Sequence, residues 1–159
     1  MTDFAGLLGT LADGGVECIL VGGVAATVHG SARLTRDVDV VYSRRAENIA
    51  RLVAVLAPFE PYLRGAPPGL PFRWEDATIA RGLNFTLTTT LGDIDLLGEI
   101  TGGGGFDDLR PHSHFVHVFD RDVLCLNLSM LIRVKRAAGP PRDLEVIAEL
   151  EAIADETDR

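Results

Sequence analysis

The chain has 159 residues and a formal net charge of −8, and 47% of its residues are hydrophobic. This composition is typical of a soluble globular protein, and the length predicts one domain with its own core. The acidic balance argues against general binding to DNA or RNA, because a phosphate backbone attracts cationic surfaces. No apolar run reaches the ~20 residues of a membrane helix, and the N-terminal residues carry no basic signal region. We therefore expect a cytoplasmic protein with no membrane partner.

The first predicted element is an amphipathic helix over residues 3–12, in which phenylalanine and leucine follow helical spacing. After a turn, the apolar run 16–21 predicts a buried strand. Gly22 and Gly23 follow at once, and residues 24–29 predict a short helix. A helix that begins at two glycines presents unpaired amide groups and the positive end of its dipole, so this turn suits a phosphate group.

Two aspartates open the next predicted strand, over residues 37–41, after a spacer of thirteen residues that follows Gly23 and includes the short helix. Residues i and i+2 of a strand point the same way, so Asp37 and Asp39 share one face. Two adjacent carboxylates repel each other, and one pKa should rise unless a cation lies between them. Hard oxygen ligands of this kind suit Mg²⁺.

A double glycine, a spacer and an Asp-x-Asp strand together resemble the nucleotidyltransferase superfamily of the DNA polymerase beta type. The resemblance implies an α/β (α+β) fold with a small mixed β-sheet flanked by helices. It also implies a single nucleotidyltransferase-like domain over residues 1–159. Its core would span about residues 14–128, and a C-terminal helical part would span about residues 129–155.

Further along the chain, Ser43 is a predicted cap for a helix over residues 44–56. Residues 59–72 are rich in proline and glycine and predict an irregular surface loop that could lie over a pocket. Trp74 begins a predicted short helix over residues 74–81. Its ring could stack on a base, but packing is the better interpretation.

Alternating residues then predict a hairpin, with strands over 83–89 and 93–97. The superfamily supplies a third catalytic carboxylate from a strand beside the Asp-x-Asp strand, and Asp95 matches that position. Asp93 lies at the turn, where we expect it to accept hydrogen bonds from turn amides. The alternative for Asp95 is a solvent-facing strand residue.

The glycine-rich segment 98–110 is predicted to be either a mobile flap or a plain connection. His112, His114 and His117 follow it. A zinc site is conceivable there, but no cysteine or acidic partner completes a ligand set, so surface or substrate-facing histidines are the better interpretation. Cys18 and Cys125 lie in apolar runs and are predicted to be small buried hydrophobes rather than disulfide partners.

The C-terminal part predicts a hairpin over 115–128, a helix over 130–138 capped by Ser129, and a last helix over 142–154. The runs 131–135 and 142–144 also resemble the tail of small bacterial nucleotidyltransferase-like proteins, including those related to abortive-infection toxins and antitoxins. In such proteins the lysine faces the nucleotide phosphates, which assigns that role to Lys135. Pro140 departs from the pattern, because an arginine is common there.

Lys135 is the only lysine among the fifteen basic residues. Four arginines cluster near the Asp-x-Asp strand in sequence and could form a local positive patch for a nucleoside triphosphate, because arginine binds phosphate in a bidentate manner. The alternative is a solvated loop. These residues are Arg33, Arg36, Arg44 and Arg45.

The resemblance implies a metal-dependent nucleotidyltransferase. Asp37 and Asp39 would hold two Mg²⁺ ions, and Asp95 would hold the catalytic one. The enzyme would move a nucleoside monophosphate from a nucleoside triphosphate to a hydroxyl of RNA, a protein or a small molecule, and would release pyrophosphate. The nucleotide-binding residues would be Gly22, Gly23, Arg36 and Lys135, with glycine at a position where the family often has serine.

Two alternatives stay open. The first is a catalytically weak nucleotide-binding or antitoxin-like module on the same fold. The second is a structural α/β domain whose carboxylates are surface residues. Because the chain lacks an obvious acceptor-recognition domain, a toxin or antitoxin partner could supply the acceptor.

Overall fold

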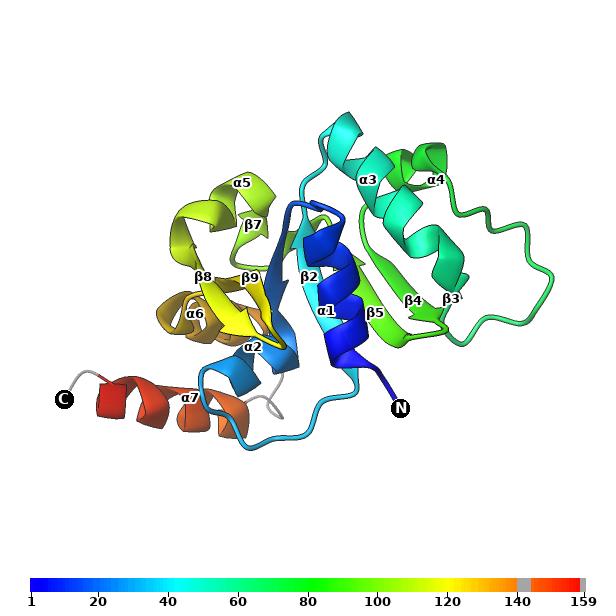
Figure 1. The fold of residues 1–159 in the computed structure, drawn as a ribbon. Coiled ribbons are helices and arrows are strands. Elements are labelled where there is room, and N and C mark those ends of the chain that lie inside the picture. Colours follow the sequence, from blue (N-terminus) through cyan, green and yellow to red (C-terminus); the bar gives the residue numbers. More distant parts are fainter. Residues whose placement is uncertain (140–143, 158–159) are drawn as a thin grey trace.

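The computed structural model describes residues 1–139 and 144–157. Within this part of the chain, seven strands form one main sheet in the order β3-β4-β5-β2-β1-β9-β8 (Figure 1). The sheet contains both parallel and antiparallel pairs, so the predicted mixed sheet and the α/β fold class are confirmed. The strands are β1 (Cys18–Val21), β2 (Asp37–Tyr42), β3 (Tyr62–Leu63), β4 (Phe85–Thr89), β5 (Gly92–Leu97), β8 (Ser113–Val118) and β9 (Arg121–Leu126).

Helices flank this sheet in two groups. In the first group, α1 contacts α3, β2 and β9 and crosses in front of β2 in Figure 1. In the second group, α6 contacts both α2 and α7. None of the helices in the described ranges combines the length and the apolar character that a membrane span requires. The helices are α1 (Phe4–Asp13), α2 (Gly22–Val28), α3 (Ala46–Leu56), α4 (Asp76–Arg81), α5 (Phe106–Leu109), α6 (Leu128–Ala138) and α7 (Leu144–Thr157), with short 3-10 turns η1 (Ala57–Phe59) and η2 (Arg110–His112).

The centre of the sheet combines a buried face and a polar face. β1 pairs with β2 in antiparallel fashion, and β2 pairs with β5 in parallel fashion. Val38 and Val40 are at most 1% exposed. Because successive residues of a strand point to opposite faces, Asp37 and Asp39 lie on the other side of β2 from these valines. Asp37 and Asp39 therefore share one face of β2, as predicted.

A buried asparagine holds the far end of the β1–β2 pair. The Asn48 side chain on α3 is 1% exposed. Its Oδ1 accepts a hydrogen bond from Glu17 N (2.7 Å), and its Nδ2 donates to Glu17 O (3.0 Å) and Ser43 O (2.9 Å). Glu17 precedes β1 and Ser43 follows β2, so one side chain fixes both strand ends and with them the register.

Two predicted helix caps are wrong. α3 begins at Ala46 after Arg45, and its N-cap makes no side-chain hydrogen bond. Ser43 is buried near the end of β2, where the strand still pairs with the chain before β1. Likewise, α6 begins at Leu128, one residue before Ser129. The predicted end of α6 is confirmed, because Gly139 adopts a left-handed conformation (φ 71°) there.

Two segments predicted as loops contain regular structure. Segment 59–72 includes β3, which pairs with the edge of β4. Segment 98–110 folds into a small hairpin of β6 (Glu99–Ile100) and β7 (Gly104–Gly105), followed by α5. Short strands of two residues carry too little alternation to be recognised in the sequence. Trp74 has the predicted packing role, since its Nε1 donates to Val53 O (2.9 Å) beside the core.

We predict that Asn48→Ala lowers the free energy of unfolding by about 2–4 kcal/mol, because it leaves several buried backbone groups without partners. Asn84→Ala is the matched control: Asn84 is exposed and accepts one hydrogen bond, from Gly98 N (2.8 Å). We expect that control to lose less than about 1 kcal/mol. Urea unfolding of the three proteins measures the difference, and equal losses would contradict a clamping role for Asn48.

Candidate active site

Three carboxylates meet on the polar face of the sheet. Asp37 and Asp39 come from β2, and Asp95 comes from β5, where it lies directly opposite Asp39 in the parallel pair. One ligand oxygen from each carboxylate lies within 4.8 Å of the others. The side chains of Asp37 and Asp95 are 31% and 20% exposed, so the group is sheltered but open to solvent on one side. The structure therefore brings together the three residues predicted to be catalytic and metal-binding.

An arginine that the sequence analysis did not single out reaches into this group. Arg64 follows β3, and its Nη2 donates to Asp95 Oδ1 at 2.8 Å. Its Nη1 lies 3.6 Å from Asp37 Oδ2, and its Nε lies 3.5 Å from Asp93 Oδ2. One guanidinium thus bridges aspartates of two neighbouring strands. We call Asp37, Asp39, Asp93 and Asp95 the carboxylate cluster.

The charges in this cluster are only partly balanced. Burial, followed by repulsion from Asp37 and Asp95, raises the pKa of Asp39 to about 8, and Lys135 offsets part of this rise. Burial and the neighbouring Asp95 also raise the pKa of Asp37, although Arg64 opposes the shift. Both directions match the prediction that adjacent carboxylates without a cation hold a proton more tightly.

The first glycine of the predicted phosphate turn lies against Asp39. Gly22 is the first residue of α2 and has a positive φ of 67°. A Cβ at this position would lie 2.0 Å from Asp39 Oδ2, so only glycine leaves the carboxylate in place. Gly23 is also tightly packed, because a Cβ there would lie 2.6 Å from Thr35 Oγ1. The helix begins at the glycines themselves, two residues before the predicted start.

The chemistry of the cluster fits a divalent cation. Asp39 Oδ1 is buried and has no hydrogen-bond partner. An unpaired buried carboxylate oxygen is costly, and a metal ion is the kind of partner that satisfies it. Aspartate oxygens are the donors that Mg²⁺ prefers, and these three can approach one ion together. Within residues 1–139 and 144–157, this is the one group of acidic, histidine or cysteine side chains with such spacing.

Some of the predicted basic residues lie near the carboxylates, and others lie at the opposite end of β2. Lys135 lies in the last turn of α6, and its charge reaches Asp39. Arg36 is exposed beside the start of β2. Arg44 lies beyond the opposite end of β2, where its guanidinium donates to Tyr42 Oη (2.6 Å) and Ile79 O (2.9 Å). Arg45, the N-cap of α3, is also at that end. The predicted patch of four arginines near the carboxylates is therefore wrong for Arg44 and Arg45.

Several smaller predictions are corrected or left open. Asp93 was predicted to accept hydrogen bonds from turn amides, but its carboxylate contacts Arg64, and the amide of Leu91 in the turn donates to Thr89 Oγ1 (3.0 Å) instead.

The three histidines belong to no metal-binding group in the described ranges, and His114 Nδ1 lies 2.5 Å from Asn127 Oδ1. The Pro140 departure and the 142–143 part of the tail motif lie outside the described residues.

The predicted buried position is confirmed for Cys125 and holds only in part for Cys18. Cys18 is half-buried, Cys125 is buried, and neither forms a disulfide. Burial raises the pKa of both thiols to about 12. Both therefore stay protonated at neutral pH, which argues against a nucleophilic role.

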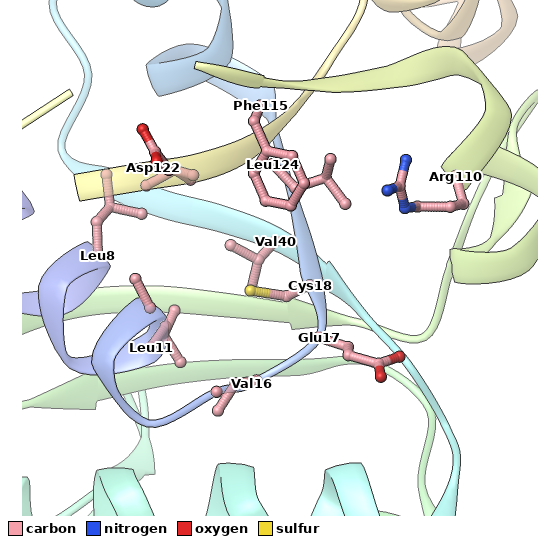
Figure 2. Close-up of a pocket in the computed structure, with 13 residues that line it drawn as sticks. Leu8, Leu11, Val16, Glu17, Cys18, Val40, Arg110, Phe115, Asp122 and Leu124 are labelled. Atoms are coloured by element: carbon pink, nitrogen blue, oxygen red, sulfur yellow. The ribbon is translucent and has the colours of Figure 1, made fainter. Parts of the chain in front are cut away.

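One cavity borders the cluster at Asp93, and another lies on the opposite face of the sheet. A cavity of about 790 Å³ adjoins the N-terminal ends of β2 and β5 and is lined by residues that include Arg36, Thr88 and Asp93. A second cavity, of about 430 Å³, lies under α1 with Cys18 and Val40 at its floor (Figure 2). Val40 points away from the aspartates of β2, so this second cavity is on the opposite face of the sheet.

Comparisons with known proteins agree with this architecture. The sequence matches no protein-family model and no curated protein. The structure is similar to the crystal structure of a Thermotoga maritima protein proposed to be a nucleotidyltransferase. The similarity has a TM-score of 0.54 and covers 99% of this chain and 96% of that chain, at 13% sequence identity. The chain therefore has a nucleotidyltransferase-like fold.

We predict that Gly22→Ala disturbs the cluster beyond the strain that it adds to the backbone. Gly15→Ala is the matched control, since Gly15 has nearly the same φ (70°) but no atom within 4 Å of an added Cβ. The control should lose about 1–2 kcal/mol of stability, and Gly22→Ala about 1–3 kcal/mol more, because Asp39 must move. Urea unfolding measures both, and equal losses would show that Asp39 moves aside freely.

We also predict a pH-dependent effect of Asp39→Asn in metal-free protein. Folding raises the pKa of the Asp39 carboxyl from 3.8 to about 8, so the protonated form stabilises the folded state. This contribution to stability is complete below about pH 4, falls as the pH rises, and is lost once the pH has passed about 8. The variant should melt somewhat higher than the wild type near pH 5, and its advantage should grow by about 3 °C or more near pH 9.

Asp13→Asn is the control for this experiment. Arg121 lowers the pKa of Asp13, so that carboxyl is ionised at both pH values. We expect the melting difference between Asp13→Asn and wild type to be the same near pH 5 and pH 9. Thermal unfolding in EDTA measures these differences, and an Asp39→Asn difference that stays constant with pH would contradict the raised pKa.

Proposed function

We propose that this protein is a metal-dependent nucleotidyltransferase. The observation that carries the proposal is the carboxylate group of Asp37, Asp39 and Asp95, which contains a buried oxygen without a partner and lies against the backbone of Gly22. The nucleotidyltransferase-like fold supports the same general activity. Fold alone does not define an activity, so the proposal depends on the chemistry of this site.

Asp37, Asp39 and Asp95 would hold two Mg²⁺ ions. When bound, these ions would lower the pKa of an acceptor hydroxyl and balance the charge that develops on the phosphates. The acceptor oxygen would form a bond to the α-phosphorus as the bond to pyrophosphate breaks, and the hydroxyl proton would pass to solvent. The carboxylates would fix the positions of the reacting groups, which lowers the entropic part of the barrier.

Three parts of the chain would bind the nucleotide. Gly22 and Gly23 would face the phosphates. Because α2 has only seven residues, the place of Gly22 beside Asp39 supports this role more than a helix dipole does. Lys135 would add positive charge from the α6 side, where its field already reaches Asp39. Arg36 would meet a sugar or phosphate group bound in the cavity that Asp93 also borders.

The acceptor hydroxyl would belong to RNA, to a protein or to a small molecule. The sequence also resembles nucleotidyltransferase-like proteins related to toxins and antitoxins. If that resemblance holds, a toxin or antitoxin partner in the cytoplasm would supply the acceptor hydroxyl. Affinity purification from cells, with and without added nucleoside triphosphate, tests for such a partner. Recovery of the chain alone under both conditions would favour a small-molecule acceptor.

A catalytically weak nucleotide-binding module is the second candidate. The observation that favours it is the Arg64 guanidinium, which lies among the carboxylates that the metal ions would need. A transfer assay with labelled triphosphates separates the two candidates. Binding without transfer to any RNA or protein acceptor would favour the module.

We predict that wild-type protein binds a nucleoside triphosphate only with a divalent cation, and that Asp37→Asn/Asp39→Asn weakens this binding at least about tenfold, because the oxygens that hold the metal–phosphate complex are lost. Calorimetry with each of the four triphosphates, with Mg²⁺ and with EDTA, measures it. Asp107→Asn, an exposed aspartate on α5, is the control and should bind like wild type. A folded wild-type protein that binds none of the four would contradict the proposal.

A further inference from the structure

The Arg64 guanidinium has no role in the proposed reaction, yet it makes the closest charged contacts in the cluster. It lies 2.8 Å from Asp95, 3.6 Å from Asp37 and 3.5 Å from Asp93. Two of these three aspartates are the ones proposed to hold metal ions. A guanidinium and a divalent cation compete for these carboxylates, because both are positive, repel each other and need short contacts to the same groups.

The contacts of Arg64 are incomplete for a purely structural ion pair. Its Nε is buried and donates no hydrogen bond, although Asp93 Oδ2 is near. Its side chain is still 27% exposed, and the guanidinium does not contact Asp39, whose Oδ1 stays unpaired. A buried ion pair is favourable only when its remaining polar groups are satisfied. The arrangement thus balances part of the cluster's charge and leaves the rest uncompensated.

The backbone allows the side chain to leave while its base stays fixed. Arg64 N donates to Thr86 O (3.0 Å), which anchors the residue to β4. The next residue, Gly65, has a positive φ of 77° and no atom within 4 Å of its Cβ position. Space is therefore open at Gly65. Rotation about the four side-chain bonds of Arg64 redirects the guanidinium at the cost of the hydrogen bond that its Nη2 donates to Leu87 O (2.7 Å) on β4.

We propose that Arg64 is an internal counter-ion of the carboxylate cluster, one that a divalent cation must displace and that the phosphates of an incoming nucleotide then accept. This inference rests on the proposed function. The displaced guanidinium needs a new anion, and a triphosphate provides oxygens that match its fork of donors. Metal alone therefore binds weakly, and metal with nucleotide binds well.

This arrangement couples the two ligands. Metal binding releases Arg64 for the phosphates, and phosphate binding holds Arg64 away from the metal site. By linkage, nucleotide must raise the affinity for metal by the same factor by which metal raises the affinity for nucleotide. Arg64→Gln removes the competing charge, so it should tighten the binding of metal alone and reduce the coupling.

The test is a titration of wild type and Arg64→Gln with Mn²⁺, followed by electron paramagnetic resonance and calorimetry, with and without a non-hydrolysable triphosphate analogue. We expect Arg64→Gln to bind Mn²⁺ alone about tenfold more tightly than wild type, and the analogue to improve Mn²⁺ binding less in the variant. In EDTA the variant should melt at a lower temperature than wild type, and saturating Mn²⁺ should remove that difference.

Arg121→Gln is the matched control. Arg121 makes a two-contact pair with Asp13 (2.7 and 3.0 Å) on the surface, so its loss removes an arginine–aspartate pair outside the cluster. It should leave Mn²⁺ affinity unchanged. If Arg64→Gln fails to fold without metal, Arg64→Lys keeps the charge on a shorter side chain that cannot bridge the cluster, and it should bind Mn²⁺ between two- and tenfold more tightly than wild type.

The outcomes separate this inference from the proposed function. Mn²⁺ affinity that is unchanged or weaker in the Arg64 variants, while wild type binds Mn²⁺ with the analogue, overturns the counter-ion role alone. It would show that Arg64 positions the carboxylates for metal. Failure of wild type and of the variants to bind either ligand overturns both proposals.

Discussion

The parallel pairing of β2 with β5 places like charges side by side, because Asp37 lies opposite Asp93 and Asp39 opposite Asp95. Like charges directly opposite in a sheet are destabilising. The same register buries Val38 and Val40 beside Ile94 and Leu96 on the other face, where each is at most 1% exposed. Each buried side chain contributes roughly 1.5–3 kcal/mol, and these contributions outweigh the repulsion between partly solvated carboxylates. The hydrophobic face therefore holds together a polar face that would not assemble by itself.

Several other features follow from this constraint. The positive charges near the cluster come from separate parts of the chain: Arg64 from the edge of the sheet and Lys135 from α6. Gly22 lacks a side chain where Asp39 needs space. Asn48 fixes the opposite end of the β1–β2 pair, so the strand that carries the aspartates cannot slip by one residue and turn them to the apolar face.

Much of this site could be predicted because its signals are local. Alternation along a strand places Asp37 and Asp39 on one face, and the resemblance assigns Asp95 to the neighbouring strand. Arg64 could not be found in this way, since it lies in a proline- and glycine-rich segment and meets the aspartates only through the short β3–β4 pairing. The arginine patch failed for a related reason: β2 separates Arg36 from Arg44 by its whole length, although they are close in sequence. Sequence distance along an extended strand is a poor guide to spatial distance.

The charge of the cluster also explains why a chain with one lysine and a net charge of −8 can have an anionic substrate. When all four carboxylates of the cluster are ionised, Arg64 leaves them with a formal charge of −3, and a triphosphate would be repelled. Divalent cations reverse this local charge, so recognition of the nucleotide would depend on metal rather than on a basic surface. An arginine that holds the carboxylates in the absence of metal lowers the repulsion within the fold, and the same residue would become a phosphate ligand once metal arrives. The acidic composition and a nucleotide substrate are therefore compatible, provided that metal and nucleotide bind together.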